Sequence, residues 1–315
     1  MKGTTMQRIQ YHQYGGPDVM RLEDFEPAPL GADEVLVRVR AAAANPMDFG
    51  IRLGRMKHVT GRRFPRAMGY DFAGVVEAVG DRVTRLRVGD EVLGGTPIKS
   101  AGAFADMVVA QEKGVVHKPG NVSFEDAAAI PTVGITAQQA LISKGKLQPG
   151  QAVFVHSCLG GVGRSAVQIA LAHGAAVAGS CRGEAASEAR DLGVEPVVDF
   201  GFDAASVTRR FDLVLVTAGT LSVKAARSML KPGGRIVSIL PTPSNLARSA
   251  LPGPFHAMIA RPVTQDLEEV ARAAGQGALR LPIARTVPLS QAIAALTELE
   301  RNGTAKRGKL IITPG

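Results

Sequence analysis

Short apolar runs alternate with amphipathic helical patterns through the middle of the chain, from about residue 123 to residue 240. Apolar runs of this kind, bounded by glycine or polar residues, predict buried strands. We expect such strands at 152–156, 176–180, 197–199, 212–216 and 235–239. Helices are predicted between them at 162–173, 184–192 and 221–230, the last closed by Lys231-Pro232-Gly233-Gly234. Strands that alternate with helices in this way predict a doubly wound parallel sheet.

The segments on either side of this region have a different pattern. Before residue 125, period-two alternation interrupted by glycine and proline is typical of a largely antiparallel sheet or partial barrel. Strands are predicted there at Glu34–Arg40, Phe72–Val79 and Glu91–Leu93. Ser123, with an acid three residues later, is the predicted N-cap of a helix through Ala127–Ile130. Beyond the central region we expect an irregular segment at 241–261, helices at 265–274 and 290–301, and a strand at 309–313.

A glycine turn separates the strand at 152–156 from the helix that follows it. A strand, a glycine turn, a helix and a second strand within about 30 residues present backbone N–H groups and a helix N-terminus to a pyrophosphate. Glycine is needed because a Cβ would block the phosphate and the close packing of helix on strand. The predicted dinucleotide-binding residues are Ser157, Gly160, Gly161, Val162 and Gly163.

The end of the second strand predicts which dinucleotide binds. Sites for NAD place an Asp or Glu about 20 residues beyond the glycines, on the ribose 2′-hydroxyl. Here the strand ends Gly179-Ser180-Cys181-Arg182, with no carboxylate until Glu184. The hydroxyl of Ser180 and the guanidinium of Arg182 suit a 2′-phosphate, so the sequence favours NADPH. The alternative is that Arg182 only faces solvent.

Composition narrows the class of protein without identifying it. The chain has 315 residues, of which 45% are hydrophobic and 21% charged, with a formal net charge of +9. We expect a globular, cytoplasmic protein, because no apolar stretch is long enough to span a bilayer, the N-terminus lacks the apolar core of a signal peptide and only two cysteines occur. The positive charge would permit nucleic acid binding, but the basic residues are dispersed and aromatic residues make up only 4%. The sequence therefore argues against a nucleic-acid partner.

Two side chains near the glycine turn have alternative interpretations. Cys158 lies near a predicted helix N-terminus, where thiolates are favoured, but a small residue that fills an alanine-sized gap is the simpler interpretation. His156 is expected to be packed and hydrogen-bonded, because none of the six histidines shows metal-ligand spacing.

Motifs along nearly the whole chain resemble the zinc-free quinone oxidoreductase branch of the medium-chain dehydrogenase/reductase superfamily. They are Ala44-Asn45-Pro46-Met47-Asp48, Met68-Gly69-Tyr70-Asp71-Phe72-Ala73-Gly74, Val88-Gly89-Asp90-Glu91-Val92, Ala127-Ala128-Ala129-Ile130-Pro131, Gly134-Ile135-Thr136-Ala137, the glycine turn, Leu230-Lys231-Pro232-Gly233-Gly234 and Gly308-Lys309. The resemblance implies a GroES-like catalytic domain at 1–125 and 262–315, a Rossmann-type NADP-binding domain at 126–261, and a homodimer. The cofactor residues implied further are Asn45, Thr136, Ala218 and Leu240.

The resemblance also implies that no metal takes part. Zinc-dependent relatives carry a Cys where Asn45 stands, a hydroxyl residue at Met47, and a His-Glu pair aligned with Tyr70-Asp71. A phenol and an amide are poor zinc ligands beside a thiolate and an imidazole. One departure from the family pattern is Cys158-Leu159, which replaces a pair of small residues before the double glycine. We expect this pair to alter packing without abolishing phosphate binding.

Hydride transfer without a metal needs a hydrogen-bond donor where negative charge develops on the substrate oxygen. Tyr70 is the candidate donor; the alternative is a half-buried tyrosine that ties two loops together. Asn45 is expected to border the nicotinamide or the substrate carbonyl, or else only to form the turn before Pro46. We expect Asp48 to orient its neighbours rather than act as a base.

A basic run lies between Asp48 and Asp71, where no acidic residue occurs. In the fold that the resemblance implies, this segment borders the substrate cleft, which predicts an anionic small-molecule substrate held by Arg52, Arg55 and Arg63. The alternative is a solvent-exposed basic loop.

The function that the sequence favours is NADPH-dependent reduction of quinones or activated C=C and carbonyl compounds. One alternative is an enoyl-thioester reductase of a biosynthetic pathway. The other is an NADPH-binding protein of low turnover with a structural or RNA-binding role.

Overall fold

The computed structural model of the chain describes residues 6–207, 210–302 and 308–314. The chain forms two compact units. Unit 1 comprises Met1–Thr132, Pro262–Gly275 and Arg280–Gly315, and unit 2 comprises Val133–Arg261 and Gln276–Leu279. The first boundary therefore falls after residue 132, whereas the sequence placed it after residue 125.

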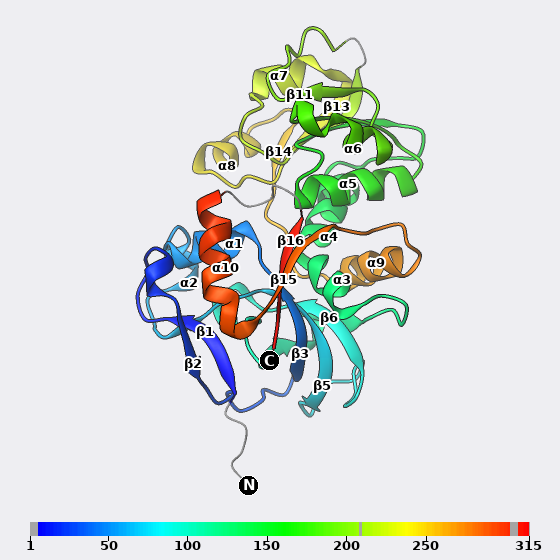
Figure 1. Cartoon of the computed structure of the whole chain (residues 1–315). Coiled ribbons are helices and arrows are strands. Elements are labelled where there is room, and N and C mark those ends of the chain that lie inside the picture. The colour runs from blue at the N-terminus through cyan, green and yellow to red at the C-terminus, as the bar shows by residue number, and fades with distance from the viewer. Residues whose placement is uncertain (1–5, 208–209, 303–307, 315) are drawn as a thin grey trace. The chain divides into compact units, whose positions relative to one another are not determined.

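Unit 2 is built on a parallel sheet (Figure 1). Its strands are β9 (Ala152–His156), β10 (Ala176–Cys181), β11 (Val197–Asp199), β12 (Phe211–Val216), β13 (Leu230–Ser238) and β14 (Phe255–Ala257). They lie in the order β11-β10-β9-β12-β13-β14, and each neighbouring pair is parallel. Because β9 lies inside the sheet and chain order runs outward from it in both directions, the sheet is doubly wound, as the sequence predicted.

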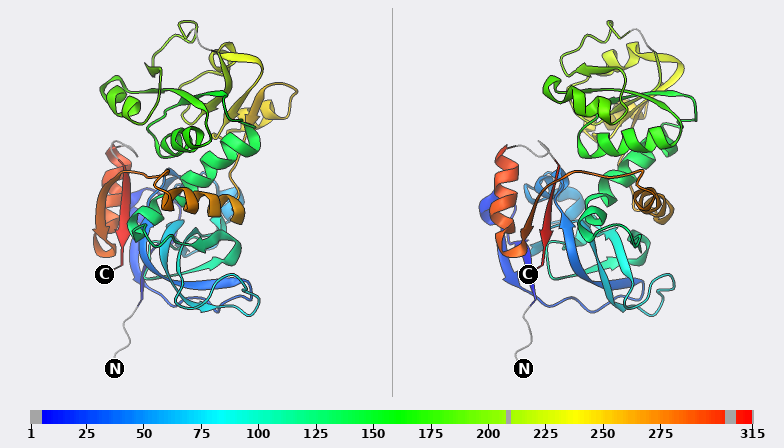
Figure 2. Two further views of the ribbon diagram at one scale, coloured as in Figure 1. Left: turned by 90° about the vertical axis from the view of Figure 1, so that its right-hand side faces the viewer. Right: turned by 45° about the vertical axis from the view of Figure 1, so that its right-hand side comes forward.

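Alternate side chains of this sheet enter two separate hydrophobic cores. Val153 and Val155 pack on the side that carries α5 (Gly161–Ala172) and α6 (Ala186–Asp191). Phe154 points the other way, toward the side that carries α7 (Val223–Ser228). Helices thus cover both faces of the sheet (Figure 2). Burial on both faces explains why these strands are continuous apolar runs rather than alternating ones.

Unit 1 is built mainly on antiparallel strands. The larger sheet has the order β15-β16-β3-β5-β6-β8, with β7 also paired to β3, and only β15 and β16 of the described strands in it run parallel. Its strands are β3 (Glu34–Ala43), β5 (Asp71–Val79), β6 (Glu91–Gly95), β7 (Met107–Gln111), β8 (Val115–His117), β15 (Ile283–Pro288) and β16 (Lys309–Thr313). A smaller sheet, β2-β1-β4, contains β1 (Gln7–Tyr11), β2 (Arg21–Asp24) and β4 (Arg66–Ala67).

Helices of unit 1 connect and cover these strands. They are α1 (Pro46–Arg52), α2 (Lys57–Thr60), α3 (Phe124–Ala129), α9 (Thr264–Gly275) and α10 (Leu289–Asn302). α4 (Pro131–Gln138) begins at the end of unit 1 and continues into unit 2. α10 packs against β15 and β16 and reaches β2 (Figure 1). The antiparallel sheet, together with the parallel sheet of unit 2, confirms the predicted combination of a mainly antiparallel β domain with a doubly wound α/β domain.

Two sequence predictions of local structure are wrong. The segment 241–261, expected to be irregular, contains α8 (Pro243–Ser249) and β14. Thr242 caps α8 by accepting a hydrogen bond from the N–H of Asn245, and Pro243 occupies the first helical turn, where its missing N–H costs nothing. The helix predicted at 221–230 spans only Val223–Ser228, and Leu230 already belongs to β13.

Among the described residues, no helix is both long enough and apolar enough to cross a membrane.

Candidate active site

The glycine turn forms an open helix N-terminus in unit 2. β9 ends at His156, and Ser157 then adopts a positive φ of 62°, which turns the chain toward Gly160, the N-cap of α5. No side chain caps this 12-residue helix. The N–H groups of its first turn, at Gly161, Val162 and Gly163, have no carbonyl acceptor four residues earlier within the helix. Such groups, with the helix dipole behind them, favour an anion.

Gly163 allows the helix to approach the strand closely. A Cβ on Gly163 would lie 2.0 Å from the carbonyl oxygen of Ser157. On the neighbouring strand, a Cβ on Gly179 would lie 2.9 Å from the Cβ of Cys158. These two contacts leave no room for a side chain, so glycine at both positions is what the geometry of the turn requires.

A buried histidine forms hydrogen bonds beside the glycine turn. His156 is fully buried, and its Nδ1 lies 2.6 Å from the Oγ of Ser180 while its Nε2 lies 2.7 Å from the Oγ1 of Thr220. Burial lowers the pKa of His156 to about 4, so the ring is neutral at physiological pH. The packed, hydrogen-bonded role expected for His156 is confirmed.

Ser180 differs from the expectation that it would contact a 2′-phosphate. It is fully buried, and its hydroxyl oxygen accepts a hydrogen bond of 3.2 Å from the backbone N–H of Ser157, in addition to its contact with His156. The side chain therefore holds the turn in place from inside the sheet. The sequence could not show this role, because the consecutive residues Ser180 and Cys181 are both buried, and no alternation of buried and exposed positions marks the end of β10.

Arg182 is exposed at the carboxyl end of β10. Within residues 6–207, 210–302 and 308–314, no hydrogen bond or ion pair engages its guanidinium. Beside it lies Asp199, a carboxylate that the sequence analysis missed. Asp199 pairs with Cys181 across the sheet and accepts a 2.7 Å hydrogen bond from the N–H of Gly183. Its other oxygen accepts a 3.1 Å hydrogen bond from the N–H of Gly201, so both oxygens stabilise the turns at this edge.

Two further predicted cofactor residues lie at the same carboxyl edge of the sheet. Ala218 follows β12, and Leu240 follows β13. A Cβ on Gly219, next to Ala218, would be 3.9 Å from Leu240 Cδ1. Thr136 lies on α4 and is 9% exposed; its role toward a nicotinamide stays a prediction.

Cys158 is a buried thiol. Burial raises its pKa to about 12, because a thiolate would be poorly solvated there. The structure therefore supports the interpretation of Cys158 as a packing residue.

A buried polar cluster in unit 1 contains Asn45, Asp48, Asp71, Thr132 and Lys309. Asn45 Nδ2 donates to Asp71 Oδ2 at 2.9 Å, and Lys309 Nζ donates to Asn45 Oδ1 at 2.7 Å. Thr132 Oγ1 donates to Asp71 Oδ1 at 2.6 Å. At the start of α1, the N–H of Asn45 donates to Asp48 Oδ2 at 2.6 Å. We call these five residues the lysine cluster.

Burial shifts the pKa of each ionisable group in the lysine cluster. It raises the pKa of Asp48 to about 8, and the nearby Asp71 carboxylate adds to this rise. Desolvation also raises the pKa of Asp71 and lowers that of Lys309. Asp48 Oδ1 has no hydrogen-bond partner among the described residues, which is consistent with a carboxyl group that keeps its proton near neutral pH.

The raised pKa of Asp48 predicts a stability that depends on pH. When unfolded, Asp48 titrates near its ordinary value of about 3.9. Between that pH and its folded pKa of about 8, the folded chain binds the extra proton. Asp48 thus lowers the free energy of unfolding as pH rises through this window, by up to about 1.4 kcal/mol per pH unit. We expect Asp48→Asn, which keeps an acceptor for the N–H of Asn45, to flatten this slope in urea unfolding at pH 4.5, 6 and 7.5.

Exposed Asp81 provides the matched control. Asp81→Asn should leave the slope as it is in the natural chain. An Asp48→Asn slope equal to that of Asp81→Asn would show that Asp48 ionises normally in the folded state.

Tyr70 and Asn45 stand where the resemblance places zinc ligands, and the side chains of both form hydrogen bonds to other residues of unit 1. The Tyr70 hydroxyl donates to the carbonyl of Ile98 at 3.0 Å, and the residue is only 3% exposed. Because a phenol has one proton, this bond opposes the expected role of Tyr70 as donor to a substrate oxygen. It agrees with the alternative that Tyr70 ties two segments together. Among the described residues, no group of His, Cys, Asp or Glu side chains could hold a metal.

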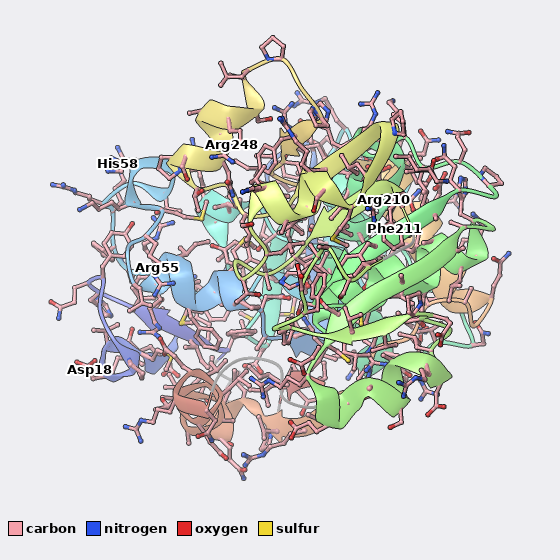
Figure 3. All side chains as sticks on the ribbon, turned by 90° about the horizontal axis from the view of Figure 1, so that it is seen from above. Asp18, Arg55, His58, Arg210, Phe211 and Arg248 are labelled. Atoms are coloured by element: carbon pink, nitrogen blue, oxygen red, sulfur yellow. The ribbon has the colours of Figure 1, made fainter. Side chains whose placement is uncertain are left out.

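Arg52 does not hold a substrate. It is fully buried, forms an ion pair with Glu300 on α10 and donates to the carbonyl of Gly15 at 2.5 Å. It therefore links α1 to α10, and the expectation for Arg52 is wrong. Arg55 and Arg63 are both exposed, and Figure 3 shows Arg55 on the segment between α1 and α2.

Comparisons with known proteins agree with this architecture. Family models match an alcohol dehydrogenase GroES-like domain at residues 31–120 and a zinc-binding dehydrogenase at residues 192–312. A quinone oxidoreductase of Pseudomonas aeruginosa is 38% identical over 205 residues, 64% of this chain and 61% of that protein. An NADPH-dependent alkenal/one oxidoreductase of Arabidopsis thaliana chloroplasts is 34% identical over 239 residues, 73% of this chain and 61% of that protein.

The solved structure of a quinone oxidoreductase from Pseudomonas syringae is similar over the whole chain. It is 31% identical, with a TM-score of 0.84 over 98% of this chain and 100% of that one. A GroES-like β unit combined with a Rossmann-type sheet defines a medium-chain dehydrogenase/reductase. The chain belongs to the quinone oxidoreductase-like branch of that superfamily.

Proposed function

We propose that the protein is an NADPH-dependent oxidoreductase that reduces quinones or activated C=C and carbonyl compounds by hydride transfer without a metal. The observation that carries this proposal is the N-terminus of α5, which no side chain caps and which Gly163 allows to pack closely against the end of β9. Related proteins named quinone oxidoreductase and NADPH-dependent alkenal/one oxidoreductase support the reaction class.

The residues of unit 2 fit a phosphorylated dinucleotide. The N–H groups of Gly161, Val162 and Gly163 would bind the pyrophosphate. The guanidinium of Arg182 would bind the 2′-phosphate, while Ala218 and Leu240 would border the cofactor along the sheet edge. When bound, the reduced nicotinamide supplies the hydride.

The lysine cluster sets the shape of unit 1 near Asn45. Lys309 polarises the Asn45 amide through its carbonyl oxygen, and Asp71, itself held by Thr132, accepts from the amide nitrogen. Asn45, Asp48 and Tyr70 are then positioning residues: Asp48 holds the start of α1, and Tyr70 holds the turn at Ile98. We infer that the protein contributes to catalysis mainly by placing the substrate and excluding water.

Arg182 tests the choice of cofactor. A hydrogen bond to a charged group contributes about 1.5–3 kcal/mol, so Arg182→Gln should weaken NADPH binding about 10- to 100-fold. NADH binding should stay unchanged, because NADH lacks the 2′-phosphate. Titration by nicotinamide fluorescence measures both. Arg190→Gln removes an exposed arginine from α6 and should change neither affinity. Equal losses for NADPH and NADH would refute the role of Arg182.

An NADPH oxidation screen tests the reaction itself. Quinones, 2-alkenals with enones, and enoyl thioesters form its three arms. Turnover that is fastest with quinones or enones supports the proposal, whereas turnover confined to enoyl thioesters would indicate a biosynthetic reductase. NADPH binding without turnover in any arm, together with salt-sensitive RNA retention, would indicate the non-enzymatic alternative.

We also propose that the chain forms a homodimer, as its family resemblance implies. Sedimentation velocity at micromolar concentration tests this, and a monomer with full NADPH-dependent turnover would contradict it.

A further inference from the structure

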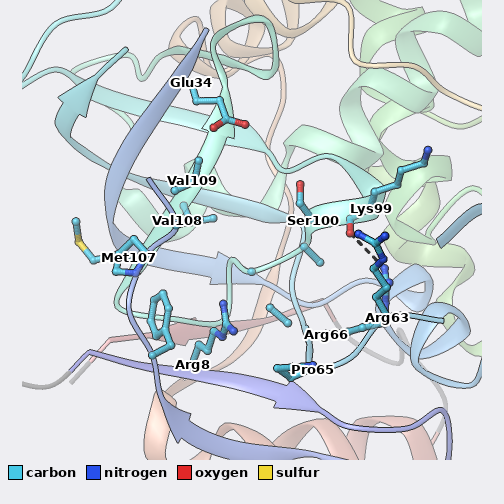
Figure 4. Close-up of a pocket in the computed structure, with 16 residues that line it drawn as sticks. Arg8, Glu34, Arg63, Pro65, Arg66, Lys99, Ser100, Met107, Val108 and Val109 are labelled. Carbon is cyan, nitrogen blue, oxygen red and sulfur yellow. Dashed lines mark hydrogen bonds between the residues drawn. The ribbon is translucent and has the colours of Figure 1, made fainter. Parts of the chain in front are cut away.

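Unit 1 contains a cavity of about 360 Å³ that none of the lysine cluster residues lines. Residues of β1, β3, β4 and β7 form its walls, together with the segments 25–28 and 99–102 (Figure 4). Its volume lies in the range of small-molecule sites. The cavity is therefore a separate feature of unit 1, formed by strands that the proposed reaction does not use.

The charges that face the cavity are unbalanced. Four cationic side chains and one carboxylate line it: Arg8, Arg63, Arg66, Lys99 and Glu34. The carboxylate of Glu34 is already satisfied, because it accepts hydrogen bonds from the N–H of Gly31 at 2.9 Å and from the side chain of Gln111 at 3.1 Å. The excess of positive charge would favour an anion in this space.

Two of the cations are fixed in place. Arg66 donates to the carbonyl oxygens of Thr60 at 2.7 Å and Lys99 at 3.3 Å. The Arg8 guanidinium lies 4.8 Å from the centre of the Phe25 ring, and its Nε donates to Gln10 at 2.6 Å. Among the described residues no ion pair engages either guanidinium group, so both add to the positive field while their positions stay defined.

The other two cations are free to bind a ligand. Arg63 and Lys99 are exposed, and no hydrogen bond or ion pair engages either side-chain nitrogen in the part of the chain that the structure describes. Figure 4 shows Arg63, Arg66 and Lys99 gathered on one side of the cavity. The sequence placed Arg63 beside a substrate cleft, whereas the structure places it on the wall of this cavity.

The opposite side of the cavity is mainly apolar, although Figure 4 also places Arg8 and Glu34 there. Met107, Val108 and Val109 of β7 lie there in Figure 4, and Phe25 and Pro27 also line the space. Three cationic groups on one side and mainly aliphatic and aromatic groups on the other match an amphipathic molecule better than a free inorganic anion.

We propose that this cavity is a binding site for a small amphipathic anion, with a carboxylate or phosphate head at Arg63 and Lys99 and a short apolar tail against β7. The site is independent of the cofactor turn and of the proposed reaction, because it uses none of their residues. Its affinity falls as salt rises, since the recognition is charge-assisted and partly exposed.

Isothermal titration of the full-length chain with octanoate and octyl phosphate at low salt tests the site. At least one probe should saturate with one molecule per chain, and comparison of the two identifies the preferred head group. Octan-1-ol, which has the tail without the charge, should bind at least about tenfold more weakly. The double variant Arg63→Gln/Lys99→Gln should weaken the preferred probe at least about tenfold.

The double variant Arg62→Gln/Lys57→Gln is the matched control. It removes the same charge from exposed residues of the same region that do not line the cavity. It should retain the affinity of the natural chain for the preferred probe. An NADPH titration, expected to be unchanged in both variants, checks that each chain is folded. The proposal is overturned if neither anionic probe saturates, if octan-1-ol binds equally well, or if the control variant loses as much affinity as the cavity variant.

Discussion

Replacing Lys309 by methionine is expected to lower the free energy of unfolding by about 1–3 kcal/mol, because the buried Asn45 carbonyl oxygen loses its donor and the nearby Asp71 carboxylate loses a compensating charge. Lys309 is 9% exposed, and its ammonium group donates to Asn45 at 2.7 Å. Asp71, which is completely buried, would remain without a cation. Urea unfolding at pH 7 measures the change, and Lys57→Met, at an exposed lysine, should alter it by less than about 0.5 kcal/mol.

We expect the charge of Asp71 to contribute to this loss, and a double variant separates charge from packing. Asp71→Asn in the Lys309→Met background removes the unpaired carboxylate while keeping an oxygen that can accept from Thr132. It should recover part of the lost stability. A loss below about 1 kcal/mol in the single variant would mean that the ammonium contributes little, and no recovery in the double variant would mean that packing dominates.

Gly163→Ala should weaken NADPH binding at least about 100-fold, since about two charge-assisted hydrogen bonds of about 1.5–3 kcal/mol each would be lost from the pyrophosphate. The added Cβ would lie 2.0 Å from the carbonyl oxygen of Ser157, so the start of α5 must move away from β9. The N–H groups of Gly161 and Val162 would move with it. Nicotinamide fluorescence measures the affinity.

Gly120→Ala is the control for this substitution. A Cβ at Gly120 meets no atom within 4 Å, so the variant should bind NADPH as the natural chain does. Circular dichroism should show both variants folded. A Gly163→Ala chain with natural affinity would mean that the cofactor does not lie on this turn.

Continuous apolar runs allowed the strands of unit 2 other than β14 to be predicted. β9 and β11 have the predicted bounds, 152–156 and 197–199. The side chains of β9 are buried on both faces between helices, which leaves a clear signal in the sequence, whereas β11 is an edge strand that is only partly buried. β15 lies at the edge of its sheet with three exposed residues in succession, and it gave no comparable pattern.

The residues that surround the candidate site were harder to predict, because strand pairing brings them together. Asp199 reaches Gly183 only because β10 and β11 are neighbours. Lys309 reaches Asn45 from the far end of the chain, because β16 pairs with β3. Residue types and spacing indicated the cofactor turn, which is local in sequence, but not these contacts, which depend on the sheet order.

Arg52 illustrates the opposite error. It lies in a basic run that predicts a solvent-exposed or ligand-binding face, yet it is fully buried against Glu300. A run of charges does not reveal which member has a partner elsewhere in the chain. The amphipathic pattern of α10, on which Glu300 lies, gave no sign of this ion pair.

A crystal structure grown in the presence of NADPH tests the central claim most directly. We expect the pyrophosphate within hydrogen-bond distance of the N–H groups of Gly161–Gly163, and the 2′-phosphate against Arg182. Cofactor density located elsewhere on the chain, or a sheet edge that stays empty at saturating NADPH, would contradict the account.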